Sequence, residues 1–121
     1  MAYLFIFGLG YSASHVREVA RAAGWQVSAT GSAGDMAFDD APAVARALAG
    51  ASHVLSSVPP NGGRDPVLDH YGTELRGKTL AYLSSTGVYG DAAGAWVDES
   101  APVGTGRRTD RTAADAAWLA Q

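Results

Sequence analysis

Apolar residues follow two different periods along this chain, and the periods alternate from the N-terminus onward. Tyr3–Phe7 is an unbroken apolar run, which is typical of a strand buried on both faces of a parallel sheet. Apolar side chains then recur at helical spacing through residues 14–23, and Gly24 follows as a helix stop. Residues 25–30 alternate with the period of a strand. The pattern therefore predicts a strand, a helix and a second strand.

The same alternation continues to the end of the chain. It predicts a short strand at residues 36–38, a helix over 40–49, strands at 52–58 and 78–83, and helices over 65–75 and 109–120. Strands separated by helices indicate crossover connections and a doubly wound parallel α/β sheet. We expect about five strands in the order 3-2-1-4-5, forming a single domain over residues 1–121. Its ligand crevice should lie at the carboxyl ends of the first and fourth strands.

A glycine turn joins the first strand to the first helix. Gly8 permits a tight turn, Gly10 lets backbone N–H groups approach a pyrophosphate, and Ala13 is small enough for the helix to pack on the strand. The phosphates would lie at a helix N-terminus, where unpaired N–H groups and the helix dipole favour anions. The motif predicts the dinucleotide site of a Rossmann fold, and a purely structural turn is the alternative.

Composition narrows the class of protein. The 121 residues contain no cysteine, which excludes disulfides and thiolate chemistry, and the three histidines lack metal-ligand spacing. The formal net charge of −3 argues against a nucleic-acid partner. There is no apolar run long enough to span a membrane and no signal-peptide pattern. We therefore expect a cytoplasmic protein with no membrane partner and no bound metal.

Four local patterns, taken together, resemble one family. They are Gly8–Ala13, Ser56–Pro60, Leu83–Asp91 and Val97–Pro102, and the third, with its Ser-Ser-Thr-Gly-Val-Tyr-Gly sequence, is the most specific. Together they resemble the extended or atypical short-chain dehydrogenase/reductases, the family of nucleotide-sugar epimerases and dehydratases. The resemblance corresponds to the N-terminal part of such an enzyme, before its last strands and its substrate domain.

The resemblance implies a catalytic serine but an incomplete catalytic set. Ser85, with Ser84 and Thr86 as near substitutes, matches the family serine that hydrogen-bonds the substrate during hydride transfer. A role in satisfying backbone groups at the strand end is the alternative. The family's Tyr-x-x-x-Lys pair is absent, and the best register places Arg107 and Arg111 there. Arginine stays protonated, so Arg107 cannot supply the tyrosine's proton, whereas Arg111 can hold a ribose hydroxyl or a phosphate.

The residues after the second strand bear on the choice of cofactor. NAD-binding relatives hold the ribose 2′-hydroxyl with an acidic residue there, but this chain has Thr30-Gly31-Ser32, and Asp35 lies five residues late. Neutral hydroxyls do not repel a 2′-phosphate, so NADP is slightly favoured over NAD. Turn hydrogen bonds are the alternative role for Thr30 and Ser32. The expected cofactor-binding residues are Gly8, Leu9, Gly10, Tyr11, Ser12, Thr30, Gly31, Ser32, Ser57, Val58, Pro59, Ser84 and Arg111.

The expected function is dinucleotide binding, with little or no catalysis by this chain alone. One alternative is an active NAD(P)-dependent oxidoreductase or nucleotide-sugar epimerase/dehydratase, completed by a C-terminal part, whose small-molecule substrate the sequence does not identify. Another is a structural or oligomerisation domain with an empty crevice. Relatives pair through the helices that match residues 65–75 and 109–121, which implies a homodimer. Its apolar face would comprise Val67, Leu68, Tyr71, Leu75, Trp118 and Leu119.

Overall fold

A parallel four-stranded sheet forms the centre of the computed structural model, which describes residues 2–84 and 109–121. Its strands lie in the order β2-β1-β3-β4. All three strand pairings are parallel. The strands are β1 (Tyr3–Phe7), β2 (Gln26–Ala29), β3 (His53–Ser56) and β4 (Thr79–Tyr82).

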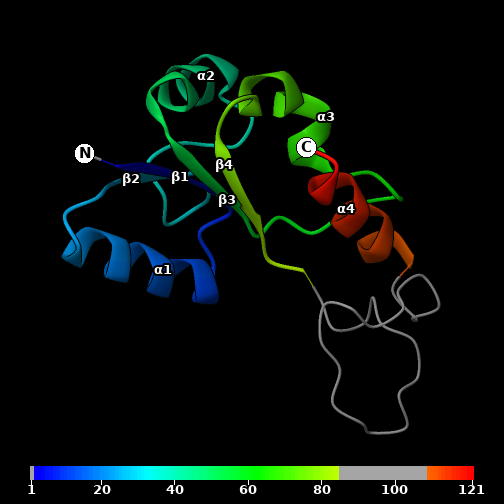
Figure 1. Cartoon of the computed structure of the whole chain (residues 1–121), viewed down its shortest axis with the longest axis horizontal. Coiled ribbons are helices and arrows are strands. Elements are labelled where there is room, and N and C mark those ends of the chain that lie inside the picture. Colours follow the sequence, from blue (N-terminus) through cyan, green and yellow to red (C-terminus); the bar gives the residue numbers. More distant parts are fainter. Residues whose placement is uncertain (1, 85–108) are drawn as a thin grey trace, which may run out of the picture.

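Helices cover the two faces of this sheet unequally (Figure 1). On one face lies α1 (Tyr11–Ala22). On the other lie α2 (Ala41–Gly50), α3 (Pro66–Tyr71) with the 3-10 helix η1 (Gly72–Leu75), and α4 (Thr109–Leu119). The connection from β1 through α1 to β2 and the connection from β3 through α3 to β4 therefore cross opposite faces, as a doubly wound sheet requires.

Alternation along β1 divides the core into two layers. Phe5 and Phe7 pack with residues of α2, α3, η1 and α4, and the Phe7 ring stacks on Tyr71 with centroids 5.4 Å apart. Leu4 and Ile6 point to the opposite face and pack against Ala13 of α1. Because β1 is paired on both edges and buried on both faces, it is the strand around which the domain is built.

The predicted α/β class is confirmed, and the strand order agrees for the four strands that form. The predicted strand at residues 36–38 is wrong: a single bridge between Thr30 and Met36 stands in its place. The amides of Asp35 and Met36 both donate to Ala29 O, at 2.8 and 3.3 Å, which turns the chain back on itself. Phe38 then packs its ring against Tyr71, with centroids 5.4 Å apart.

Two predicted helices have different limits in the structure. The first begins at Tyr11 instead of residue 14, with Gly10 as its N-cap. The predicted helix over 65–75 starts correctly, since Asp65 is the N-cap and Pro66 the first helical residue, but it continues from Gly72 as a 3-10 turn. Tyr71, at the junction, has a φ of −131°, which is outside the α-helical region.

Candidate functional site

The turn after β1 brings the glycine motif to the carboxyl edge of the sheet. Gly8 has a φ of +84°, a left-handed conformation that glycine adopts without strain. A Cβ atom on Gly8 would lie 2.9 Å from Ser57 Oγ and 3.1 Å from Val58 Cγ2, so the turn has no space for a side chain here. Gly8 is thus required by the fold itself.

Gly10 has the opposite surroundings. It is the N-cap of α1 with a φ of −97°, and no side chain caps the helix. A Cβ atom on Gly10 would meet no atom within 4 Å apart from those of its chain neighbours. The first N–H groups of an α-helix have no acceptor inside the helix, and the first turn of α1 carries no acidic side chain. Open space beside free N–H groups is the arrangement that accepts an anion.

Two hydroxyl side chains hold this turn in place. Thr30, only 1% exposed, accepts a hydrogen bond from Gly8 N through Oγ1 at 3.0 Å, and its carbonyl accepts one from Leu9 N at 3.0 Å. Ser57 Oγ donates to Gly8 O. The structure therefore brings Gly8, Thr30 and Ser57 together where β1, β2 and β3 end. Thr30 and Ser57 face the turn, which is the role that the sequence left as an alternative for Thr30.

The other residues of the turn divide between core and surface. Leu9 packs its side chain into the core on the α1 side, and its amide already donates to Thr30 O. Tyr11 is 83% exposed, and its ring lies 4.7 Å from that of His15 between centroids. Ser12 is exposed as well. Tyr11 and Ser12 are the first two residues of α1, so their amides border the opening beside Gly10.

Beyond β2 and β3, predicted residues lie along the same edge. Gly31 and Ser32 are exposed after β2. Asp35, which is exposed, accepts a hydrogen bond from Ala29 N at 2.9 Å through Oδ2, so one of its two carboxylate oxygens is engaged with the turn. Val58 is partly buried and Pro59 is exposed after β3.

Ser56, which the sequence analysis named only as the first residue of the Ser56–Pro60 pattern, is fully buried at the end of β3, where its Oγ accepts a hydrogen bond from Val58 N at 3.2 Å. In the sequence, the feature that could have pointed to Ser56 is a short polar residue at the end of an apolar strand.

The rim after β4 is described only as far as Ser84, which is exposed. Ser85, Thr86 and Arg107 lie outside the described residues. Arg111 of α4 donates from Nη1 to Leu83 O at 2.9 Å, and its guanidinium carbon lies 5.7 Å from the centroid of the Tyr82 ring. Burial raises the pKa of Tyr82. Arg111 thus lies at the carboxyl end of β4, engaged with the strand end.

A buried carboxylate joins α3 to α4, and only half of its role follows from the sequence. Asp65 Oδ1 caps α3 by accepting hydrogen bonds from Val67 N at 2.9 Å and Leu68 N at 3.1 Å. Its Oδ2 accepts a third bond from Trp118 Nε1 at 2.9 Å. The cap is readable from Asp-Pro in sequence. The contact with Trp118 is not, because 53 residues separate the partners.

This packing changes the face expected for a homodimer. Val67, Tyr71, Leu75 and Trp118 are buried in the core of the same chain, and Leu68 is partly buried. Leu119, by contrast, is 83% exposed. The predicted apolar face is therefore largely an internal one.

No group of three or more His, Asp or Glu side chains in residues 2–84 and 109–121 is placed to hold a metal ion. Within the same residues, every helix is too short or too polar to cross a membrane.

The chain is similar to a solved structure described as a functionally unknown conserved protein from Silicibacter pomeroyi DSS. The two share 31% sequence identity with a TM-score of 0.77. The similarity covers 99% of this chain and 48% of the Silicibacter protein, so this chain spans about half of that protein's length. No protein-family model matches the chain, and no curated protein matches it. The likeness supports the Rossmann-like α/β fold.

Proposed function

We propose that this chain binds a dinucleotide, NADP or NAD, across the carboxyl ends of β1 and β3. The pyrophosphate would lie at the N-terminus of α1, between Gly10 and Ser57. This is the point at which the strand order reverses direction, since β2 lies on one side of β1 and β3 on the other. Crevices at such a point are the usual ligand sites of open α/β sheets.

The opening beside Gly10 is the observation that carries this proposal. A helix of 12 residues begins there without a side-chain cap, and the space that a Cβ would occupy is empty to 4 Å. A turn with only a structural role would be expected to use Ser, Thr, Asp or Asn as the N-cap, because each satisfies a free N–H group. Glycine leaves those groups to be satisfied by solvent or by a bound anion.

Each residue has a distinct part in the proposed site. The amides of Tyr11 and Ser12 would donate to the pyrophosphate, while Thr30 and Ser57 fix the turn that aims them. The exposed backbone at Gly31 and hydroxyl of Ser32 would lie near the adenosine ribose. Because neutral Thr30, Gly31 and Ser32 follow β2 directly and Asp35 has one oxygen engaged with Ala29 N, NADP remains slightly favoured over NAD.

Catalysis is proposed to be weak or absent in this chain alone. The resemblance to the short-chain dehydrogenase/reductases supports cofactor binding, but arginines occupy the positions of the family's tyrosine and lysine. An active oxidoreductase or epimerase/dehydratase is the second candidate. The Silicibacter protein supports it, because this chain matches only 48% of that protein's length, and a further part of similar size would be available to complete an enzyme. A structural domain with an empty crevice is the third.

A two-dimensional ¹⁵N–¹H NMR titration with NADPH tests the site directly. We expect the largest amide shifts at Gly8–Ser12 and at Ser57, with smaller ones at Gly31 and Ser32. AMP is the matched control, because it lacks the pyrophosphate and the nicotinamide and should shift the amides of Tyr11 and Ser12 much less at the same concentration. Shifts confined to other parts of the chain would reject the site, and no shift with NADPH or NADH at about 1 mM would reject the function.

Self-association through α3 and α4 is a separate proposal, and the burial of their apolar residues leaves few side chains available for it. A homodimer through these helices would have to use the residues that remain exposed, of which Leu119 is the largest apolar one. Analytical ultracentrifugation of the wild type and of Leu119→Glu decides whether this homodimer exists. A dimer is expected to dissociate in the variant, and a monomeric wild type would end this proposal.

A further inference from the structure

A large aromatic side chain stands exposed at the start of α1. Tyr11 is 83% exposed, whereas each of the other tyrosines that the structure describes is buried or partly buried. Its ring makes an edge-to-face contact with the ring of His15, with 4.7 Å between centroids and an angle of 77° between the ring planes. Such a contact occupies at most one face of the Tyr11 ring. The other face is therefore available to a second planar group.

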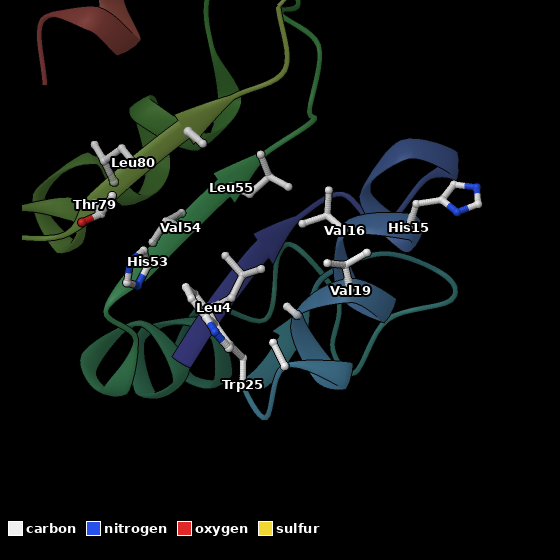
Figure 2. Close-up of a pocket in the computed structure, with 13 residues that line it drawn as sticks. Leu4, His15, Val16, Val19, Trp25, His53, Val54, Leu55, Thr79 and Leu80 are labelled. Carbon is white, nitrogen blue, oxygen red and sulfur yellow. The ribbon is translucent and has the colours of Figure 1, made fainter. Parts of the chain in front are cut away.

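The Tyr11 ring lies on the side of α1 that faces β3 and β4. His15, Val16 and Val19 border a groove of about 650 Å³ on this side, over β3 and β4 (Figure 2). Tyr11 precedes His15 by four residues, and residues at this spacing share one face of a helix. Tyr11 thus extends the same side of α1 by one turn, toward the carboxyl edge of the sheet.

The proposed pyrophosphate position divides this edge of the sheet into two parts. β2 lies on one side of β1, and β3 and β4 lie on the other. The adenosine ribose is proposed to lie near Gly31 and Ser32, which follow β2. The second nucleoside, which carries the nicotinamide, would then extend over the ends of β3 and β4. Tyr11 is on this second side, and its own amide borders the pyrophosphate position.

From this arrangement we infer that the free face of the Tyr11 ring stacks on the nicotinamide of the bound dinucleotide. The inference rests on the proposed function and assigns the nicotinamide half of the cofactor to a side chain. Nicotinamide is planar, and in the oxidised cofactor its ring carries a positive charge, which the electron-rich face of a tyrosine ring attracts. The edge-to-face contact with His15 restricts the orientation of the Tyr11 ring, so less freedom is lost when the nicotinamide binds.

A matched pair of ligands tests this inference on the 121-residue chain. NADP⁺ and 2′-phospho-ADP-ribose share the adenosine, the 2′-phosphate and the pyrophosphate, but only NADP⁺ has the nicotinamide. Isothermal titration calorimetry should show that Tyr11→Ala binds NADP⁺ about tenfold more weakly than the wild type and binds 2′-phospho-ADP-ribose equally well. Tyr11→Phe keeps the ring and should bind both ligands like the wild type. NAD⁺ and ADP-ribose form the corresponding pair if the chain selects NAD.

Val19→Ala is the matched control for losing an exposed side chain from α1. Val19 is 71% exposed, two turns beyond Tyr11 on the same side of the helix, and it borders the groove. We expect Val19→Ala to bind NADP⁺ with the affinity of the wild type. The urea midpoints of Tyr11→Ala and Val19→Ala should both stay close to that of the wild type, because each side chain is mainly in solvent.

The possible contrary results are distinct. Unchanged NADP⁺ affinity in Tyr11→Ala would overturn the stacking and leave the pyrophosphate site in place. An equal loss for NADP⁺ and 2′-phospho-ADP-ribose would also overturn it, because the side chain would then act on the turn. A matching loss in Val19→Ala would place the nicotinamide in the groove instead. A wild-type chain that binds no member of either ligand pair would reject the proposed function, and the stacking with it.

Discussion

The two faces of the sheet differ in what closes them, although the same strands supply both. On the face covered by α2, α3 and α4, Phe7 is fully buried among aromatic rings and Asp65 ties two helices together. On the other face α1 is the only helix that the described residues supply, and Val19 remains 71% exposed. The first face has the packing of a finished core. The second carries the free N-terminus of α1 and the open groove, so the proposed dinucleotide site borders it.

The comparison implies that stability resides mainly in the closed face. Phe7→Ala should lower the free energy of unfolding by about 4 kcal/mol, because it removes a large buried ring and leaves a cavity. Val19→Ala on the open face should change it by less than about 0.5 kcal/mol. Urea unfolding followed by circular dichroism measures both. Equal losses at the two positions would show that the groove is closed in solution.

Gly8 and Gly10 provide the next contrast, within one turn. Gly8→Ala should cost about 3 kcal/mol, because alanine is strained at a φ of +84° and its Cβ would crowd Ser57 Oγ. Gly10→Ala should cost less than about 0.5 kcal/mol, since its Cβ meets nothing within 4 Å. The measurement is again the urea midpoint. A large loss at Gly10 would mean that this opening is part of the packed fold and not a free site.

The carboxylate between α3 and α4 is the third test. Asp65→Ala should lower stability by about 2 kcal/mol, because α3 loses its cap and Trp118 Nε1 loses its acceptor. Trp118→Phe keeps the aromatic ring and removes one of these bonds, so about 1 kcal/mol is expected. Thermal unfolding by calorimetry distinguishes the two. Identical losses would indicate that the cap of α3 contributes nothing.

Thr30 joins the core to the turn at Gly8, and replacing it should lower the free energy of unfolding less than Asp65→Ala does. Thr30→Val keeps the shape of the side chain but removes the acceptor for Gly8 N, so we expect a loss of about 1.5 kcal/mol. Thr30→Ser restores an oxygen and should recover part of it. If Thr30→Val lowers NADPH affinity with no loss of stability, the hydroxyl contacts the ribose and not the turn.

The smallest effect belongs to an exposed ion pair between the loop before α3 and a residue of α3 itself. Arg64 Nε donates to Asp69 Oδ2 at 2.8 Å, and this bond holds the pKa of Asp69 below its usual range. A lowered carboxyl pKa adds stability above the unfolded-state pKa, and that contribution disappears on acidification through the lowered value. Both side chains are exposed, so Asp69→Asn should leave the urea midpoint unchanged within error at pH 7. A clear loss of stability in Asp69→Asn at pH 7 that disappears at pH 3 would show that this ion pair contributes more than expected.

The sequence predicted those features whose cause is local. The apolar run Tyr3–Phe7 and the glycines after it fix a buried strand and a turn, and Asp65 before Pro66 fixes a helix start. The predicted strand at residues 36–38 failed because its apolar pattern is also satisfied by a side chain that packs without a ladder: Phe38 lies against Tyr71, 33 residues away.

Contacts between distant segments explain the rest of the difference. Whether Thr30 faces a ligand or the turn depends on Gly8, which only the folded sheet brings within 3.0 Å. The same holds for Trp118, whose apolar character suggested a surface for a partner but which packs inside its own chain. The half of the sheet face without a helix has no local signature, because Leu4 and Leu55, which line it, are themselves only 7% and 5% exposed and have the same apolar character as residues on the covered face.

Isothermal titration calorimetry of NADPH against wild type and Gly10→Asp tests the central claim most directly. The variant places a carboxylate beside the α1 N-terminus, where its Cβ has free space and the carboxylate can cap the helix, so its urea midpoint should be no lower than that of the wild type. We expect saturable binding to the wild type and at least about tenfold weaker binding to the variant, since the new charge and side chain occupy the pyrophosphate position. Equal affinities in two equally stable proteins would contradict the account.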